Sequence, residues 1–367
     1  MKNMKLVPIL SITLLVGLVL SGCIDSVFDL PITYESHPTK ISYTITYGYL
    51  ATCTGSGRYD IKYDCDIPDK LLGFQDYDIL YKQDFEVVSI DNNSFVRWNI
   101  SDNDEKTYEL GLKADVIVES FLVPDISGSG ALSIDQINSS YPEVTDKYLQ
   151  SQYNDDLLLI DPTDLNIKNE ARNIVGLSDS NNSFLLAMDI FFWFSENTDY
   201  AIHNGGGSNV QPASLTLQKK TGDCDDLSFL YISLCRAVGI PARFIRGYLL
   251  SEDVGGFITA TPHAWTEVFV GGSIGNNGWI PVECACVCDD SKTNVNQNFG
   301  VENAFHLRLF IDDGTNESLQ TSLSGISYVT YGADRQIDLE SFNNVDNYIE
   351  LESEKLVVTS KGSRYYQ

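Results

Sequence analysis

A cysteine lies where the sequence predicts the first turn of a helix. The helix is expected to run to about Val238, with Asp223 as its N-cap and with Gly239 and Pro241 as the residues that end it. At a helix N-terminus the macrodipole and the free N–H groups stabilise a thiolate and can donate to an oxyanion. The acids that surround Cys224 raise a thiol pKa, so a cationic partner is needed to populate the thiolate.

A histidine and an acid follow on two predicted strands. His263–Val270 is expected to be one strand and Gly278–Glu283 the next, with glycine and asparagine loop residues between them. Adjacent antiparallel strands can bring the carboxylate of Glu283 to the second ring nitrogen of His263. Together with Cys224, these residues provide a nucleophile, a base and an orienting acid, in that chain order.

Several short sequence motifs around these residues resemble those of the transglutaminase-like superfamily. The resemblance covers about 145–310. The motifs occur in the same order as in the family: Gly222-x-Cys224-x-Asp226, Leu234 to Arg243, Gly247-Tyr248, His263-Ala264-Trp265-x-Glu267 and Gly278-Trp279-x-Pro281-Val282. It implies a papain-like α+β core, in which the helix N-terminus that bears the cysteine packs on an antiparallel sheet. It also implies a Cys-His-Asp triad and acyl transfer from an amide through a thioester.

The chain departs from the family pattern at the third triad position. Glu283 replaces the usual aspartate, and the cysteines of Cys284–Cys288 alternate directly after it. A glutamate can still accept from an imidazole N–H if its strand lies slightly back, and Asp289 or Asp290 could substitute for it. The three cysteines favour one disulfide and a free thiol over a zinc site, because no second pair of ligands is visible.

Four further residues are expected near the site. Asp226 and Glu267 are interpreted as structural, each bonding a backbone turn or an arginine. Trp265 either packs in the core or donates its indole N–H to an oxyanion. Gln218 is a candidate side-chain donor to the oxyanion, or else a solvated loop residue. No EF-hand pattern is present, so we expect neither a metal ion nor a cofactor.

The N-terminus has the pattern of an export signal. A basic start precedes the apolar run Leu6–Leu20, which is short for a membrane span, and Leu-Ser-Gly-Cys follows, similar to a prokaryotic lipobox. We therefore predict that 1–22 is a signal peptide and that Cys23 carries a lipid. The protein would then be exported and anchored to the outer face of the cell membrane. An ordinary signal peptide and an uncleaved apolar anchor are the alternatives.

The remaining chain divides by its hydrophobic pattern. With 367 residues, two folded modules are expected. We assign 23–39 to a tether and 40–125 to an all-β, sandwich-like module, because apolar and polar residues alternate there. Helical periodicity followed by strands marks 126–310 as the α+β catalytic domain. The segment 311–367 is expected to hold C-terminal strands.

Charge and cysteine content limit the partners. The formal net charge is −27 and no Lys/Arg-rich patch is present, which argues against nucleic-acid binding. A peptide or protein amide is the expected substrate. In an exported protein Cys53 and Cys65 could form a disulfide, whereas Cys235 is expected to be buried and inert. The alternatives to an enzyme are a non-catalytic module that binds a peptide or envelope polymer, and a structural lipoprotein with Cys224 in a disulfide.

Overall fold

The computed structural model describes residues 30–80, 86–90, 93–178, 180–202, 210–285 and 290–367. The predicted signal peptide 1–22 and the predicted lipid anchor Cys23 lie outside these ranges. Within the described ranges, no helix combines the length and the apolar character needed to cross a membrane.

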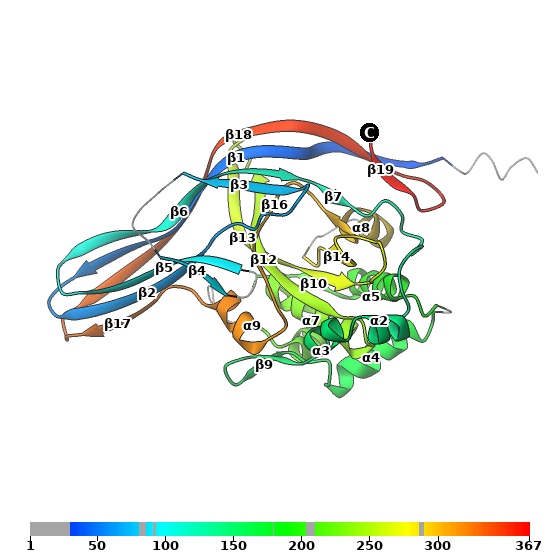
Figure 1. Cartoon of the computed structure of the whole chain (residues 1–367), viewed down its shortest axis with the longest axis horizontal. Coiled ribbons are helices and arrows are strands. Elements are labelled where there is room, and N and C mark those ends of the chain that lie inside the picture. Colours follow the sequence, from blue (N-terminus) through cyan, green and yellow to red (C-terminus); the bar gives the residue numbers. More distant parts are fainter. Residues whose placement is uncertain (1–29, 81–85, 91–92, 179, 203–209, 286–289) are drawn as a thin grey trace, which may run out of the picture.

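Two antiparallel sheets form the β-rich module (Figure 1). Alternate residues of the first long strand, among them Ile41, Tyr43, Ile45 and Tyr47, are buried in a core that both sheets share. The predicted all-β module is therefore present. In spatial order the sheets contain β19 (Arg364–Tyr366), β18 (Gln336–Val358), β1 (Ile32–Thr54), β6 (Lys106–Glu119) and β3 (Gln75–Ile79), and β17 (Ser327–Tyr331), β2 (Arg58–Asp66), β5 (Asn93–Asp102) and β4 (Glu86–Ile90).

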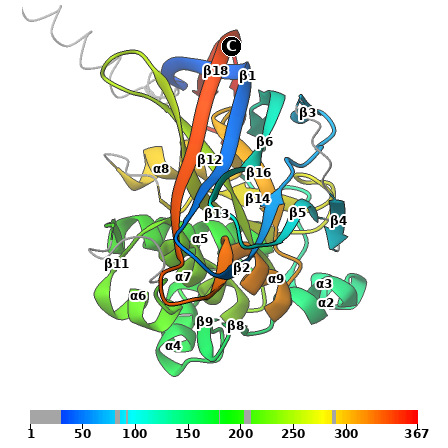
Figure 2. The same ribbon diagram turned by 90° about the vertical axis from the view of Figure 1, so that its left-hand side faces the viewer.

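The C-terminal strands belong to these same sheets. β18 pairs with β1 from Ile32↔Val358 to Thr54↔Gln336, and Figure 2 shows the two strands side by side over their length. The C-terminal strands β17, β18 and β19 thus belong to the β-rich module and do not form a separate sheet. Because β1 begins at Ile32, the predicted tether 23–39 is partly a strand. Local alternation reveals a strand but not its partner, which here lies about three hundred residues away.

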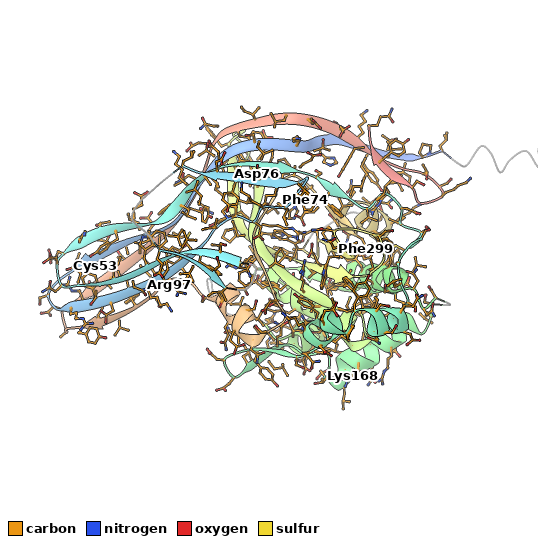
Figure 3. All side chains as sticks on the ribbon, viewed as in Figure 1. Cys53, Phe74, Asp76, Arg97, Lys168 and Phe299 are labelled. Atoms are coloured by element: carbon orange, nitrogen blue, oxygen red, sulfur yellow. The ribbon has the colours of Figure 1, made fainter. Side chains whose placement is uncertain are left out.

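The expected disulfide in the β-rich module is absent, since Cys53 and Cys65 are both free and buried. Cys53 lies close to the turn between β1 and β2, whereas Cys65 lies near the far end of β2. The two residues therefore sit at different distances from the turn that joins their strands. Figure 3 places Cys53 in the projecting end of the module.

α7 (Cys224–Ala237) is the central helix of the catalytic body. All of its residues from Asp226 to Arg236 are buried, as expected for a helix enclosed on every side. α4 (Leu165–Val175) and α5 (Ser183–Asn197) pack against it and share its core.

Shorter elements complete the body and join it to the β-rich module. They are α2 (Ile134–Ser140), α3 (Pro142–Tyr148), β8 (Gln152–Asn154), β9 (Leu157–Ile160), β10 (Asp199–Tyr200), α6 (Ala213–Lys219), β11 (Thr221–Gly222), α8 (Ser291–Asn298), α9 (Asn316–Leu323), and the paired β7 (Phe121–Leu122) and β15 (Val301–Glu302).

The sheet beneath α7 has the order β14 (Trp279–Val282), β13 (Ile258–Phe269), β12 (Ala242–Glu252) and β16 (His306–Ile311). β13 begins five residues before His263, so that residue lies inside the strand and not at its start. β14 pairs only with Thr266–Phe269 of β13. The edge of β13 beside His263 is therefore left uncovered by β14.

Candidate active site

Cys224 is the first residue of α7, as the sequence predicted. Asp223 is the N-cap and forms a capping box with Asp226. The carboxylate of Asp226 also accepts from the backbone N–H of Gln211 at 2.5 Å and from its Nε2 at 2.9 Å. Asp226 thus fixes the start of the helix on the preceding loop, which is the structural role expected of it.

The surroundings of Cys224 favour the neutral thiol. Burial raises the pKa of Cys224, and the carboxylates of Asp225 and Asp223 raise it further, while a hydrogen bond from the backbone N–H of Ala264 lowers it. The thiol lies 3.8 Å from Oδ1 of Asp225. Burial, with Asp223 and Asp226, raises the pKa of Asp225 itself to about 6. These surroundings therefore favour the thiol form of Cys224 over the thiolate.

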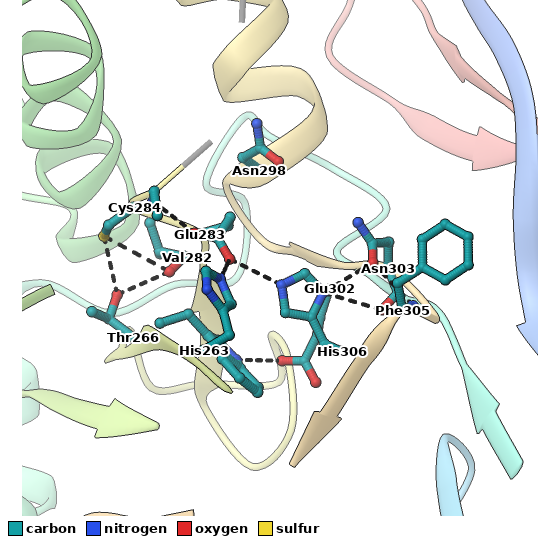
Figure 4. Close-up of polar contacts among 12 residues, drawn as sticks. His263, Thr266, Val282, Glu283, Cys284, Asn298, Glu302, Asn303, Phe305 and His306 are labelled. Atoms are coloured by element: carbon teal, nitrogen blue, oxygen red, sulfur yellow. Dashed lines mark hydrogen bonds and ion pairs between the residues drawn. The ribbon is translucent and has the colours of Figure 1, made fainter. Parts of the chain in front are cut away.

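His263 and Glu283 form the contact that the sequence predicted. Nε2 of His263 lies 2.7 Å from Oε2 of Glu283, and the two side chains are 9% and 5% exposed (Figure 4). Burial lowers the pKa of His263, but the Glu283 carboxylate outweighs it, and the net pKa is raised. Burial raises the pKa of Glu283, but the two histidines that contact it hold it well below its usual range. Glu283 is thus an ionised carboxylate that can stabilise the imidazolium form of His263 once the ring has taken up a proton.

Backbone contacts fix the position of Glu283. Oε1 accepts from the backbone N–H of Ala285 at 2.7 Å, which leaves Oε2 directed at His263. Oγ1 of Thr266 donates to the carbonyl of Val282 at 3.1 Å and so holds the end of β14 against β13. The glutamate lies directly after this strand end and reaches back to the imidazole.

A second histidine, which the sequence analysis missed, contacts the same carboxylate. Nε2 of His306 lies 2.9 Å from Oε2 of Glu283, and its Nδ1 lies 2.9 Å from Oδ1 of Asn303 (Figure 4). His306 belongs to no recognisable motif. Its position follows from the pairing of β16 with β12, which no local pattern reveals.

Trp265 packs behind the two histidines. Its ring lies 5.9 Å from that of His263 and 4.9 Å from that of His306, measured between centroids. The side chain is fully buried and its Nε1–H donates to Glu302 at 2.9 Å. The indole N–H is therefore already engaged, and of the two roles considered for Trp265 the structure supports packing.

Glu267 belongs to a buried ionic cluster below Trp265. It accepts from Arg243 at 2.8 Å and from Arg308 at 2.6 Å, and Arg308 also pairs with Glu302. Burial raises the pKa of Glu267, but Arg308 and Arg243 outweigh this effect and lower it to about 2. Its predicted structural contact with Arg243 is present.

Two other expected residues are not brought to the thiol. Gln218 lies on the exposed side of the last turn of α6, and no contact in the described part of the chain joins it to Cys224. Asp290 is the N-cap of α8, where its carboxylate accepts from the N–H of Thr293 at 2.9 Å. Neither residue can therefore take the role considered for it, because local helix geometry already determines its direction.

The other cysteines near the site are not placed for catalysis. Cys235 is buried inside α7 as expected, and Cys284 is buried with its Sγ 3.8 Å from Oγ1 of Thr266. Cys286, Cys288 and Asp289 fall outside the described residues.

A cavity adjoins the strand that carries His263. Its volume is about 260 Å³, and it lies between the β-rich module and the catalytic sheet. Pro262, which directly precedes His263, lines it with Tyr63, Arg246 and Tyr248. The walls combine aromatic faces with a guanidinium that pairs with Asp66 at 2.7 Å. Aromatic walls with a few placed polar groups are typical of ligand-binding pockets.

The site contains the residue types that nucleophilic catalysis needs. Both Cys224 and His263 adjoin Ala264, whose backbone N–H bonds to the thiol. Because Nε2 of His263 is engaged by Glu283, Nδ1 is the nitrogen that remains for the thiol proton.

Comparison with known proteins gives the same family. Residues 171–284 match the model of the transglutaminase-like superfamily. An uncharacterised protein of Mycobacterium leprae is 31% identical over 84 residues, which is 22% of this chain and 29% of that protein. This chain thus spans less than a third of that relative.

The fold resembles that of a candidate cysteine protease from Cytophaga hutchinsonii. The two chains share 16% identity and a TM-score of 0.50, over 91% of this chain and 100% of the other. The periplasmic domain of TgpA from Pseudomonas aeruginosa shows a weaker likeness, with 14% identity and a TM-score of 0.35 over 71% of this chain and 94% of that one. On the match of its sequence, the region 171–284 belongs to the transglutaminase-like superfamily.

Proposed function

We propose that this protein is an extracytoplasmic cysteine-dependent enzyme that cleaves peptide or related amide bonds through a thioester on Cys224. The observation that carries the proposal is the contact of His263 with Glu283, beside a cysteine at the start of a buried helix. The match of residues 171–284 to the transglutaminase-like superfamily supports a cysteine-dependent enzyme. The type of bond that is cleaved and the location outside the cytoplasm are parts of our proposal.

The reaction begins when Sγ of Cys224 attacks the amide carbon and Nδ1 of His263 takes the thiol proton. The imidazolium that forms is stabilised by the ionised Glu283 at 2.7 Å. The tetrahedral oxyanion can accept from the backbone N–H groups at the start of α7. When the C–N bond breaks, His263 returns the proton to the leaving amine, and an acyl thioester remains on Cys224.

Water then resolves the thioester. His263 takes a proton from the water and the hydroxyl adds to the acyl carbon. The C–S bond then breaks, His263 returns the proton to Sγ of Cys224, and a carboxylic acid is released. If an amine takes the place of water, the product is a new amide. We favour hydrolysis, because the protein from Cytophaga hutchinsonii that shares the fold is described as a candidate protease.

A single assay separates the two reactions. The protein is incubated with a peptide library in the presence and absence of a fluorescent primary amine, and the products are identified by mass. We expect cleaved peptides with free carboxyl termini and little incorporated amine. Cys224→Ala should yield neither product. Amine incorporation without cleavage would show that the protein catalyses transamidation and not hydrolysis.

The location is proposed from Cys23. Cys23→Ser should abolish incorporation of a radiolabelled fatty acid and move the protein from the membrane fraction to the soluble fraction. Unchanged labelling in this variant would contradict the anchor.

One observation favours the non-catalytic alternative. Burial, Asp225 and Asp223 keep the pKa of Cys224 raised, which is compatible with an unreactive thiol. Absence of turnover together with saturable peptide binding by both wild type and Cys224→Ala would support that function.

A further inference from the structure

Three metal-ligating side chains converge at the proposed active site. Nε2 of His263, Oε2 of Glu283 and Nε2 of His306 all lie within 4.8 Å of one another. Their side chains are 9%, 5% and 4% exposed. Two imidazoles and one carboxylate are the ligand set of zinc sites that keep a fourth position open.

A second set of contacts orients two of these ligands. Oδ1 of Asn303 accepts from the backbone N–H of Phe305 at 3.1 Å, so the same oxygen can only accept from Nδ1 of His306, 2.9 Å away. The backbone N–H of Ala285 holds Oε1 of Glu283 and leaves Oε2 directed inward. A carbonyl oxygen on the outer ring nitrogen is typical of a histidine that binds metal through its other nitrogen.

Nε2 of His306 and Oε2 of Glu283 lie only 2.9 Å apart, and Nδ1 of the same ring lies 2.9 Å from Asn303. The hydrogen-bonding proton between Nε2 and Oε2 occupies the position that a metal ion bound by both atoms would take. Zinc can therefore replace this proton.

We propose that His263, Glu283 and His306 bind a zinc ion, and that the bound ion switches off the reaction. Zinc on Nε2 of His263 places the ring proton on Nδ1, the nitrogen that has to accept the thiol proton. The Nε2 proton of His306 leaves to solvent. Imidazole ligands suit zinc and not calcium. To bind the ion, the three ligand atoms need to move only slightly apart, so that each lies about 2.0–2.2 Å from the zinc.

Binding is measured in the Cys224→Ala variant of the full chain, so that the thiol cannot contribute. Equilibrium dialysis against zinc should show one saturable ion per chain, and cobalt in its place should give visible absorption bands of a low-coordinate site. Adding His306→Gln should weaken zinc binding at least tenfold. His37→Gln, which changes a described histidine in β1 outside the cluster, should leave it unchanged.

Glu283→Gln in the same background provides a second variant. Its amide keeps hydrogen-bonding capacity but is a poor zinc ligand, so it too should weaken binding at least tenfold while thermal unfolding shows a folded protein. Absence of saturable zinc binding by the Cys224→Ala protein overturns the site. Binding that His306→Gln and Glu283→Gln leave unchanged also overturns it.

The inhibitory effect rests on the function proposed above and is tested separately. Zinc should abolish turnover by wild type, and a chelator should restore it. Residual turnover by His306→Gln should need at least tenfold more zinc for the same inhibition. Equal sensitivity of both proteins would show that zinc acts at the thiol, and this overturns the switch. If the zinc site is present but wild type turns over nothing, the proposed function fails while the site stands.

Discussion

The contact of His306 with Glu283 adds a further residue to the predicted site of Cys224, His263 and Glu283. Nε2 of the histidine lies 2.9 Å from Oε2 of the glutamate, the oxygen that also contacts His263 at 2.7 Å. One buried carboxylate thus holds two imidazoles, and only one of them adjoins the nucleophile. We infer that His306 positions Glu283 and that His263 carries the proton.

Substitutions of the two histidines should therefore have different effects. We expect His263→Gln to reduce kcat/KM by about 10³-fold or more, since it removes the general base. His306→Gln should reduce it by about tenfold to a hundredfold and shift the pH dependence of kcat/KM, because Glu283 loses one of its two histidine partners. Equal losses in both variants, with parallel pH profiles, would contradict this division of roles.

Asp225 should restrain the reactivity of Cys224. Its carboxylate lies 3.8 Å from the thiol, and its own pKa is raised to about 6, so it is anionic at neutral pH and opposes the thiolate. Asp225→Asn should therefore lower the pH midpoint for alkylation of Cys224 by about one unit. The measurement is the rate of iodoacetamide labelling of the Cys224 peptide against pH, with Asp253→Asn, a loop acid of the β12–β13 connection, as the control. An unchanged midpoint in Asp225→Asn would refute the effect.

The buried cluster around Arg308 should contribute strongly to stability. Arg308→Leu leaves Glu302 without this partner and Glu267 with Arg243 alone, and such a loss costs about 3–5 kcal/mol. The surface pair of Arg97 with Asp64 is more exposed, and Arg97→Leu should cost about 1 kcal/mol or less. Denaturant unfolding of both variants measures the difference. Comparable losses would show that the cluster is not specially stabilising.

Glu267 should make the fold sensitive to acid. Arg308 and Arg243 lower its pKa in the folded protein from 4.5 to about 2, so its contribution to stability is complete above pH 4.5. That contribution is lost as the pH falls from 4.5 towards 2. Glu267→Gln lacks the group, so its free energy of unfolding should fall less steeply over this interval than that of wild type. Parallel curves would exclude the proposed contribution.

The local parts of the site could be predicted from the sequence. A capped helix start placed Cys224, and two adjacent strands brought the side chains of His263 and Glu283 within reach of each other, because each relation depends on residues close in the chain. The sequence left two roles open for Trp265, packing or donation to an oxyanion. The contact of its indole N–H with Glu302, which the sequence does not reveal, decides for packing.

The missed features depend on contacts between distant segments. The pairing of β1 with β18 and the approach of His306 to Glu283 arise from sheet order, for which single strands carry no signal. Of the two roles considered for Gln218, its exposed position on α6 agrees with a solvated residue. Its distance from Cys224 in the sequence could not decide between them, because that distance does not reveal which side of α6 it occupies.

The central claim is that Cys224 forms a thioester with the substrate acyl group. The direct measurement is intact and peptide mass analysis of wild type after reaction with an activated ester of a good peptide substrate, quenched in acid. We predict one acyl group per chain, located on Cys224 and released by hydroxylamine. Cys224→Ala should acquire none, whereas Cys235→Ala, which changes a buried cysteine on the same helix, should be acylated like wild type. Acylation elsewhere, or none in a wild-type protein that still cleaves peptides, would contradict the account.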